Sequence, residues 1–301
     1  MIVGDWGNTQ LRLWTLEGAQ NGHAPRLGRG VGQMERKELQ GHLRQTLGDW
    51  LALAQSDGVL LCGAAGSNIG LFEVDYLACP ADLDGIESAI LTQTLADIAI
   101  SILPGLASQN AFGNPDRLRG EETQILGAQR LGQVPQNALV CLPGTHPKWV
   151  QISDGRVTGF TSTLTGEVFQ ILSNHSILVP NTPQVHENTG AFMQGVERAL
   201  TCGSQTLLSD LFSIRASQIA GEFDPTCASE HLSGLLIGAD ISLAVQTFSA
   251  APSDEPTFLI GGESLCKRYA TALSAMGKVS NHINGDAMAV AGLSYVASLL
   301  G

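Results

Sequence analysis

In the first 131 residues, segments whose hydrophobic residues have the spacing of strands are followed by segments whose hydrophobic residues have the spacing of helices. An apolar run at the start ends in Asp5, and residues 11–14 alternate like a half-buried strand. Leucines four residues apart, at 39, 43, 47 and 51, indicate an amphipathic helix. The predicted elements of this half are strands over 1–5, 11–14 and 24–30, a helix over 37–54, a strand over 58–62, a helix over 84–100, a strand at 102–103 and a helix over 121–131.

The pattern restarts near residue 138 with another buried strand, and an Asp154-Gly155 turn signal joins the next two strands. The predicted elements are strands over 138–142, 149–152, 156–163 and 257–260, and helices over 166–174, 190–200, 204–219, 229–247, 264–276 and 286–300. This repeat indicates two related α/β domains that face each other across a cleft. The expected domains are residues 1–133, joined by the C-terminal helix 286–301, and residues 134–285.

Composition and charge narrow the class of protein. The 301 residues are enough for two domains, and 44% apolar with 15% charged residues is typical of a globular chain. A net charge of −12 makes nucleic acid and anionic membranes poor partners. An anionic substrate therefore needs a local basic pocket.

The cysteines and the N-terminus indicate the compartment. None of the six cysteines forms a C-x-x-C pair, and several lie in apolar runs, so buried reduced thiols are expected. The N-terminus lacks the basic segment and long apolar core of a signal peptide. No apolar run reaches the ~18 residues that span a bilayer. We expect a cytoplasmic protein and leave the oligomeric state open, with a homodimer as one possibility.

Three glycine turns follow apolar strands and have the chemistry to bind phosphate. They are Asp5-Trp6-Gly7-Asn8-Thr9, Gly144-Thr145-His146-Pro147-Lys148 and Gly261-Gly262-Glu263. The first combines backbone N–H groups for phosphate oxygens with a carboxylate, Asp5, for hydrated magnesium. The third opens a helix, whose N-terminus attracts anions, and leaves room for a nucleobase. A plain hairpin turn with a solvated Asp5 is the alternative for the first turn.

A run of polar residues, Arg119-Gly120-Glu121-Glu122, opens the helix over 121–131. Two acids at a helix N-terminus complement the helix dipole, which is one reading of the pair. The other is a general base, because a hydroxyl that attacks a γ-phosphoryl group needs a carboxylate to orient it and take its proton. Arg119 has the geometry to bind a substrate carboxylate bidentately.

Several signature motifs of other enzyme classes do not occur in the sequence. G-x-x-x-x-G-K-[ST], G-x-G-x-x-G, G-x-S-x-G and H-E-x-x-H are all missing, and the seven histidines lack metal-ligand spacing. The absence of these motifs disfavours P-loop kinases, Rossmann dehydrogenases, serine hydrolases and zincins.

The arrangement resembles the sugar kinase/Hsp70/actin superfamily, and within it the 2-keto-3-deoxygalactonate kinases (2-dehydro-3-deoxygalactonokinases). The segments that carry the resemblance are Asp5 to Arg12, Gly63-Ala64-Ala65-Gly66-Ser67, Tyr76 with Cys79-Pro80, Arg119 to Gln124, Leu142 to Trp149, Thr165-Gly166-Glu167, Asn174 to Leu178, Gly261-Gly262, Arg268-Tyr269 and Gly285-Asp286-Ala287. The resemblance implies two ribonuclease-H-like (actin-like ATPase) domains around a central cleft, which close over ATP and sugar so that water does not compete as acceptor.

The same resemblance implies ATP- and magnesium-dependent phosphorylation of the 6-hydroxyl of 2-keto-3-deoxygalactonate. It assigns Asp5 to magnesium and Glu121 to the catalytic acid position, with Glu122 as the alternative. The implied nucleotide-binding residues are Asp5, Gly7, Asn8, Thr9, Gly144, Thr145, His146, Lys148, Gly261 and Gly262. The implied sugar-acid residues are Ser67, Asn68, Tyr76 and Arg119.

The chain departs from the family mainly in the loop that follows Ser67. Asn68 and Ile69 stand where the family usually has Arg and Gln, and Arg117 stands where it usually has Val. These departures leave two alternatives open. One is a kinase for another keto-deoxy sugar acid, and the other is a non-catalytic ATP-binding sensor of the same fold.

Overall fold

The computed structural model describes residues 1–185, 187–248 and 255–300. It divides into two compact units, residues 1–137, 152–160 and 283–301 in the first and residues 138–151 and 161–282 in the second. The predicted division between residues 133 and 134 stays a prediction. No helix in the described residues is long and apolar enough to cross a membrane.

The first unit is built around a six-stranded sheet in the order β3-β2-β1-β4-β7-β6 and a three-stranded sheet in the order β5-β8-β9. Its strands are β1 (Ile2–Trp6), β2 (Gln10–Thr15), β3 (Arg26–Arg29), β4 (Val59–Gly63), β5 (Tyr76–Ala78), β6 (Leu91–Leu95), β7 (Ile98–Ile102), β8 (Gly105–Gln109) and β9 (Pro115–Leu118). Its α-helices are α1 (Leu16–Gln20), α2 (Arg36–Leu47), α3 (Leu51–Asp57), α4 (Glu121–Arg130) and α10 (Gly285–Leu300).

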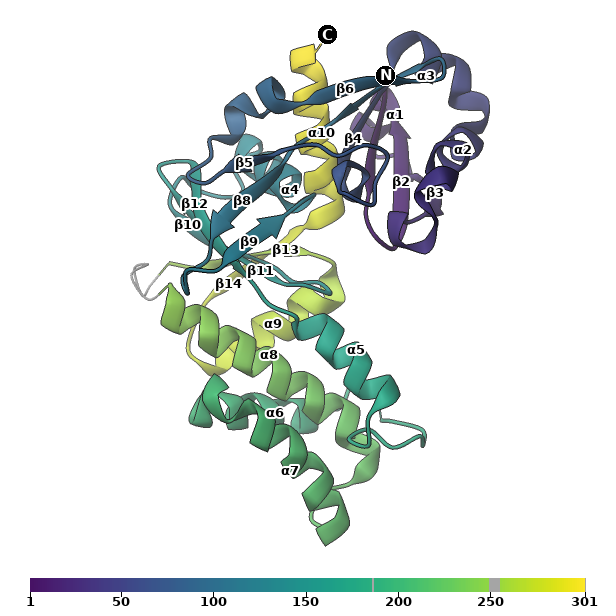
Figure 1. Ribbon diagram of the computed structural model, residues 1–301. Helices are drawn as coiled ribbons and strands as arrows, with labels where there is room; N and C mark the ends of the chain where they lie inside the picture. The colour runs from purple at the N-terminus through teal and green to yellow at the C-terminus, as the bar shows by residue number, and fades with distance from the viewer. Residues whose placement is uncertain (186, 249–254, 301) are drawn as a thin grey trace. The chain divides into compact units, whose positions relative to one another are not determined.

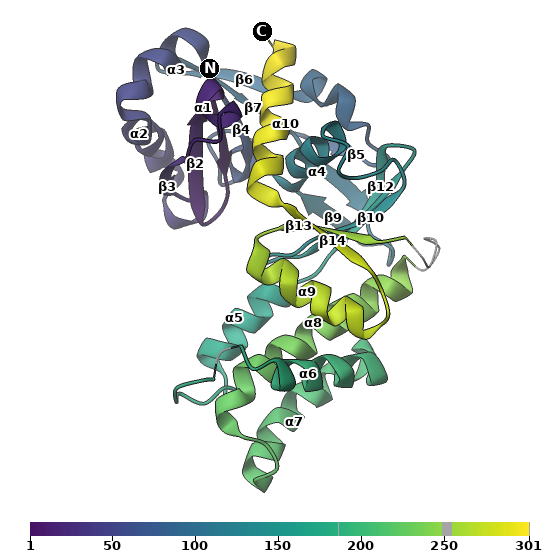
Figure 2. The same ribbon diagram turned by 180° about the vertical axis from the view of Figure 1, so that it is seen from behind.

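The chain's last helix belongs to the first unit. In Figures 1 and 2, α10 (yellow) runs beside α4. It contacts both α4 and β1. The approach of α10 to α4 is close, because a Cβ on Gly292 would lie 2.1 Å from the Thr123 carbonyl oxygen. This packing fixes α4, and with it the two acids at its N-terminus.

The second unit contains most of a five-stranded sheet in the order β12-β11-β10-β13-β14, but residues 152–160, with most of β12, and residues 283–284 of β14 are grouped with the first unit. The elements of this half are β10 (Ala138–Leu142), β11 (Lys148–Ser153), β12 (Arg156–Ser162), α5 (Thr165–His175), α6 (Thr189–Cys202), α7 (Leu207–Ala220), α8 (Ala228–Thr247), β13 (Thr257–Gly261), α9 (Glu263–Ala275) and β14 (Ser280–Asn284). When the strands of each large sheet are numbered in chain order, with β6 left out, both sheets have the order third-second-first-fourth-fifth. β6 is an extra edge strand of the first sheet. The predicted α/β class with two ribonuclease-H-like halves is confirmed.

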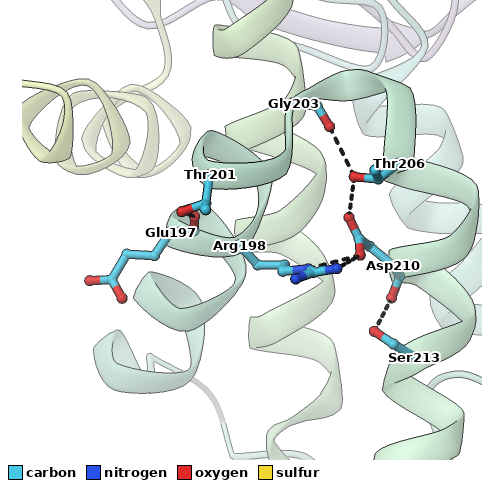
Figure 3. Close-up of polar contacts among 7 residues, drawn as sticks. All are labelled: Glu197, Arg198, Thr201, Gly203, Thr206, Asp210 and Ser213. Carbon is cyan, nitrogen blue, oxygen red and sulfur yellow. Dashed lines mark hydrogen bonds and ion pairs between the residues drawn. The ribbon is translucent and has the colours of Figure 1, made fainter.

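A buried aspartate holds the turn between α6 and α7 (Figure 3). Asp210 is only 2% exposed, and its Oδ1 accepts hydrogen bonds from Arg198 Nε (2.8 Å) and Nη2 (2.6 Å). Its Oδ2 accepts a hydrogen bond from Thr206 Oγ1 at 2.6 Å. Burial opposes ionisation of Asp210, but the hydrogen bonds from Thr206 and Arg198 outweigh it and hold the pKa of Asp210 below its usual value. This network is structural and fixes the angle between two helices.

Two predicted helices differ from the structure. The predicted helix over 84–100 is wrong, since a 3₁₀ segment (Leu83–Ala89) is followed there by the β6–β7 hairpin. Ile98 and Ile100 alternate into the core, a strand period, and Ala96 adopts a φ of 56° in the turn. The predicted helix over 37–54 is two helices, because Gly48 ends α2 with a φ of 52°.

Candidate active site

In the β1–β2 turn, the amide groups of Asn8 and Thr9 point away from the neighbouring segment 30–32. The carbonyl oxygens of Gly7, Asn8 and Thr9 accept hydrogen bonds from the backbone amides of residues 30–32, at 3.0 to 3.2 Å. A peptide's N–H points opposite to its C=O, so the N–H groups of Asn8 and Thr9 face away from that segment. Both residues are exposed. The turn thus presents amide donors of the kind that bind phosphate oxygens.

Asp5, at the end of β1, lies among charged groups. Its Oδ2 is 3.4 Å from Arg12 Nη1, which also contacts Asp286 Oδ1 at 2.8 Å. Burial raises the pKa of Asp5 to about 6; Arg12 opposes this shift, and the charges of Glu121 and Asp286 add to it. Glu121 and Asp286 therefore each lie close enough to repel Asp5, and a bound cation beside Asp5 would relieve that repulsion.

The two acids at the start of α4 occupy different environments. Glu122 is fully buried, and its carboxylate accepts hydrogen bonds from the Gly120 amide (2.6 Å) and from Thr123 Oγ1 (2.9 Å). Burial, followed by the charge of Glu121, raises the pKa of Glu122 to about 8. Glu121 is half-buried, and its Oε2 accepts a hydrogen bond from the Arg119 amide at 2.9 Å. Of the two, Glu121 is the one that reaches solvent and interacts with Asp5.

Two glycines with positive φ bring Asp5 and the start of α4 together. Gly63, at the end of β4, has a φ of 80°, and a Cβ there would lie 2.9 Å from Asp5 Oδ1. Gly120, the N-cap of α4, has a φ of 106°, and a Cβ there would lie 3.3 Å from the Gly63 Cα. Only glycine adopts these backbone angles readily. The sequence analysis noted Gly63 in a family motif but gave it no role at Asp5.

The β10–β11 turn of the second unit packs against the start of α5. Glu167 donates its amide proton to the Thr145 carbonyl oxygen at 2.9 Å, and its carboxylate lies 2.5 Å from His146 Nε2. A Cβ on Gly144 would meet no atom within 4 Å. Lys148, expected as a phosphate cation, is only 7% exposed, so protein atoms cover most of its side chain.

A cavity of about 340 Å³ lies between the β10–β11 turn and helices α5, α8 and α9. Gly144 and Gly166 line one side, and Arg268 and Tyr269 line another. Arg268 forms a bidentate ion pair with Glu230, at 3.0 and 3.3 Å. Gly261 and Gly262 connect β13 to α9, whose residues line this cavity, and a Cβ on Gly262 would meet open space.

The side of this cavity formed by Tyr269 is supported by a buried carboxyl group. Asp240 is 4% exposed and accepts hydrogen bonds from Trp149 Nε1 (3.2 Å), Thr163 Oγ1 (2.9 Å) and Tyr269 OH (2.5 Å). Burial raises the pKa of Asp240. The network ties β11, α8 and α9 together. Asp240 and Glu230 were not found in the sequence analysis, because single acids inside an apolar helix give no recognisable motif.

Of the residues expected to bind the sugar acid, all of which belong to the first unit, Tyr76 and Arg119 are in contact. Arg119 Nη2 donates to the Val74 carbonyl oxygen at 2.6 Å, and its guanidinium lies 4.2 Å from the Tyr76 ring centroid. Ser67 Oγ donates to the Ala64 carbonyl oxygen at 2.8 Å, and Asn68 is exposed. Asp5, Glu121 and this group belong to one unit, whereas the Gly144 and Gly261 turns belong to the other.

Metal-binding clusters are absent from the described part of the chain: no group of three or more His, Cys, Asp or Glu side chains is placed to hold a metal ion. Magnesium in kinases is usually held by one or two carboxylates together with water and substrate phosphates, not by an all-protein cage. Asp5 fits that kind of site. Burial disfavours the charged form of its carboxyl group, and a cation beside it would stabilise that form.

Comparison with known proteins identifies the family. Residues 5–296 match the model of the 2-keto-3-deoxy-galactonokinase family. A 2-dehydro-3-deoxygalactonokinase of Escherichia coli (strain K12) is 33% identical over 98% of this chain and 97% of its own length. A probable 2-dehydro-3-deoxygalactonokinase of Rhizobium meliloti (strain 1021) is 35% identical over 97% of this chain and 95% of its own.

A solved structure agrees with these relatives. The crystal structure of a candidate 2-dehydro-3-deoxygalactonokinase from Sinorhizobium meliloti superimposes with a TM-score of 0.84 at 32% identity, and covers 99% of this chain and 98% of that one. The suspected resemblance is confirmed over nearly the whole length. The chain belongs to the 2-keto-3-deoxy-galactonokinase family, and it is a kinase.

Proposed function

We propose that this chain transfers the γ-phosphoryl group of ATP to the 6-hydroxyl of 2-dehydro-3-deoxy-D-galactonate, giving ADP and the 6-phosphate, in galactonate catabolism. The family and the two curated relatives support the substrate and the reaction. The observation that carries the mechanism is the close approach of Asp5 and the start of α4, which meet at Gly63 and Gly120. Phosphoryl transfer needs little covalent chemistry from a protein, so positioning and charge do most of the catalysis.

Glu121 is the proposed general base. Its Oε2 is held by the Arg119 amide, which orients the carboxylate, and its half-buried position leaves it accessible to a substrate hydroxyl. Glu122 is the weaker candidate, because its buried carboxyl group is bound by Gly120 and Thr123 and its raised pKa favours the protonated form. A protonated carboxyl group cannot accept the hydroxyl proton.

The phosphate and nucleotide contacts are proposed for both units. Asn8 and Thr9 would bind phosphate through amide groups that face away from residues 30–32, and Gly7 would let the phosphate approach the turn closely. Magnesium, when bound, would neutralise phosphate charge, and Asp5 is the residue proposed to hold its water shell. Gly144, Thr145 and His146 would contact phosphate, and Gly261 and Gly262 the adenosine, whereas Lys148, whose side chain protein atoms cover, would act only through its charge. The cavity of about 340 Å³ beside Gly144 has the size of a small-molecule site.

A second keto-deoxy sugar acid is the alternative substrate. Asn68 and Ile69 are both exposed, Ile69 by 47%, in the loop that contains Ser67. Exposed side chains in a substrate loop alter specificity without altering phosphate chemistry. A different acid would leave the proposed roles of Asp5 and Glu121 unchanged.

The variant Glu121→Gln tests the assignment of the base. It preserves size and removes the proton acceptor, so kcat should fall at least ~10²-fold while ATP affinity stays close to that of the wild type. Steady-state kinetics and equilibrium ATP binding measure the two effects. An unchanged kcat would show that Glu121 is not the base.

A further inference from the structure

The small sheet of the first unit presents a cationic face around one aromatic ring. In the register of β5, β8 and β9, Tyr76 pairs with Gly105, and Ala107 pairs with both Ala78 and Arg117. Because side chains alternate along a strand, these positions lie on one face. The small residues leave this face open. The Tyr76 ring lies over Gly105, where a Cβ would be 2.8 Å from Tyr76 Cε1.

Arg119 makes most of its polar contacts within the protein. Its Nη2 donates to the Val74 carbonyl oxygen at 2.6 Å and its Nη1 to the Leu103 carbonyl oxygen at 3.4 Å. Its Nε is buried and makes no hydrogen bond to any residue that the structure describes. These two bonds fix the Arg119 guanidinium beside the Tyr76 ring, 4.2 Å from its centroid.

Arg117 is differently placed on the same face. Its side chain is exposed, and its guanidinium lies 5.5 Å from the Tyr76 ring centroid. Among the residues that the structure describes, the guanidinium donates one hydrogen bond, from Nη1 to the Asp116 carbonyl oxygen at 2.8 Å. A guanidinium has five N–H donors, so most of its capacity faces solvent.

We propose that Arg117 is a further substrate-binding residue, and that its guanidinium binds the carboxylate of the sugar acid beside the Tyr76 ring. The proposal rests on the proposed function. A sugar acid carries its carboxylate and its reacting 6-hydroxyl at opposite ends of its carbon chain, so the cation should lie apart from the base. Arg117 lies two residues before Arg119 in the chain. It is therefore about 6.6 Å further from Glu121 along the strand direction. In a chain of net charge −12, an anionic substrate needs a local cation, which Arg117 supplies on this face.

Equilibrium binding by calorimetry, without ATP, tests the proposal with 2-dehydro-3-deoxy-D-galactonate and its uncharged carboxamide. Arg117→Ala should raise the Kd of the acid by about 10- to 100-fold, the range for a charge-assisted hydrogen bond, and should leave the carboxamide and ATP unaffected. Arg117→Lys should restore part of the affinity, since it keeps the charge but not the bidentate geometry. Lys37→Ala, which removes one exposed positive charge from α2, is the matched control and should bind like the wild type.

The outcomes separate this inference from the function on which it rests. If the wild type phosphorylates the acid and Arg117→Ala binds it as tightly, only the role of Arg117 is wrong. Equal loss of affinity for the acid and the carboxamide would also overturn that role, because it indicates a general disturbance of the face. If the wild type neither binds nor phosphorylates the acid, the function fails too. A thermal melt of each variant checks that the protein is folded.

Discussion

At the scale of single residues, neighbouring groups of the same chemical type have different environments. Glu121 reaches solvent and interacts with Asp5, whereas Glu122 points inward and is bound by Gly120 and Thr123. The sequence places both acids at a helix start and cannot say which points inward, because one residue turns a helix by about 100°. The surroundings of each carboxyl group decide its role, and they come from distant segments.

The buried carboxyl group of Glu122 should make stability depend on pH. Its pKa rises from 4.5 to about 8 on folding, so the folded state holds the proton more tightly. The resulting stabilisation is fully present below about pH 4.5 and is lost as pH rises towards 8. Relative to Glu122→Gln, which cannot ionise, the wild type should lose on the order of a few kcal/mol of unfolding free energy between pH 5 and pH 8.

Urea denaturation at several pH values measures this difference. Glu17→Gln, on the exposed first turn of α1, is the matched control and should follow the wild type. A constant difference between the wild type and Glu122→Gln across this pH range would contradict the raised pKa of Glu122.

At the scale of elements, the spacing of hydrophobic residues and the turn residues predicted helices and strands correctly where the pattern was regular. The opening strands of both halves and helices α4, α6, α8, α9 and α10 lie close to their predicted ranges. The β6–β7 hairpin was missed because residues 84–100 contain enough apolar positions to fit a helix, and the strand period becomes clear only from the burial of Ile98 and Ile100. The three-stranded sheet was missed because its strands are three to five residues long, too short to show a period.

The crossing of α4 and α10 depends on a glycine. A Cβ on Gly292 would lie 2.1 Å from the Thr123 carbonyl oxygen, so Gly292→Ala must push the helices apart and should destabilise the protein by about 1–3 kcal/mol. Gly41→Ala, in the interior of α2 where a Cβ meets nothing within 4 Å, should instead stabilise by about 0.5–1 kcal/mol. The midpoints of urea unfolding compare the stability of the two variants with that of the wild type. Equal effects of Gly292→Ala and Gly41→Ala on the midpoint would refute the close packing of α4 and α10.

At the scale of the whole molecule, two halves with the same strand order carry different chemistry. The first presents carboxylates and a cationic, aromatic face, and the second presents glycine turns beside a cavity. The repeated strand pattern predicted the two halves, with a glycine turn of the same chemistry at the start of each. It could not predict which polar side chains surround each site, because Arg117, Glu230 and Asp240 lie in short strands or apolar helices without a motif.

The central claim is tested most directly by measuring ADP formation with ATP, magnesium and a panel of aldonic and keto-deoxy sugar acids. The account predicts turnover with 2-dehydro-3-deoxy-D-galactonate, one 6-phosphate for each ADP, and loss of turnover when magnesium is removed. Higher activity on a gluconate-derived keto acid would move the substrate to the alternative and keep the mechanism. No turnover with any acid of the panel would contradict the account.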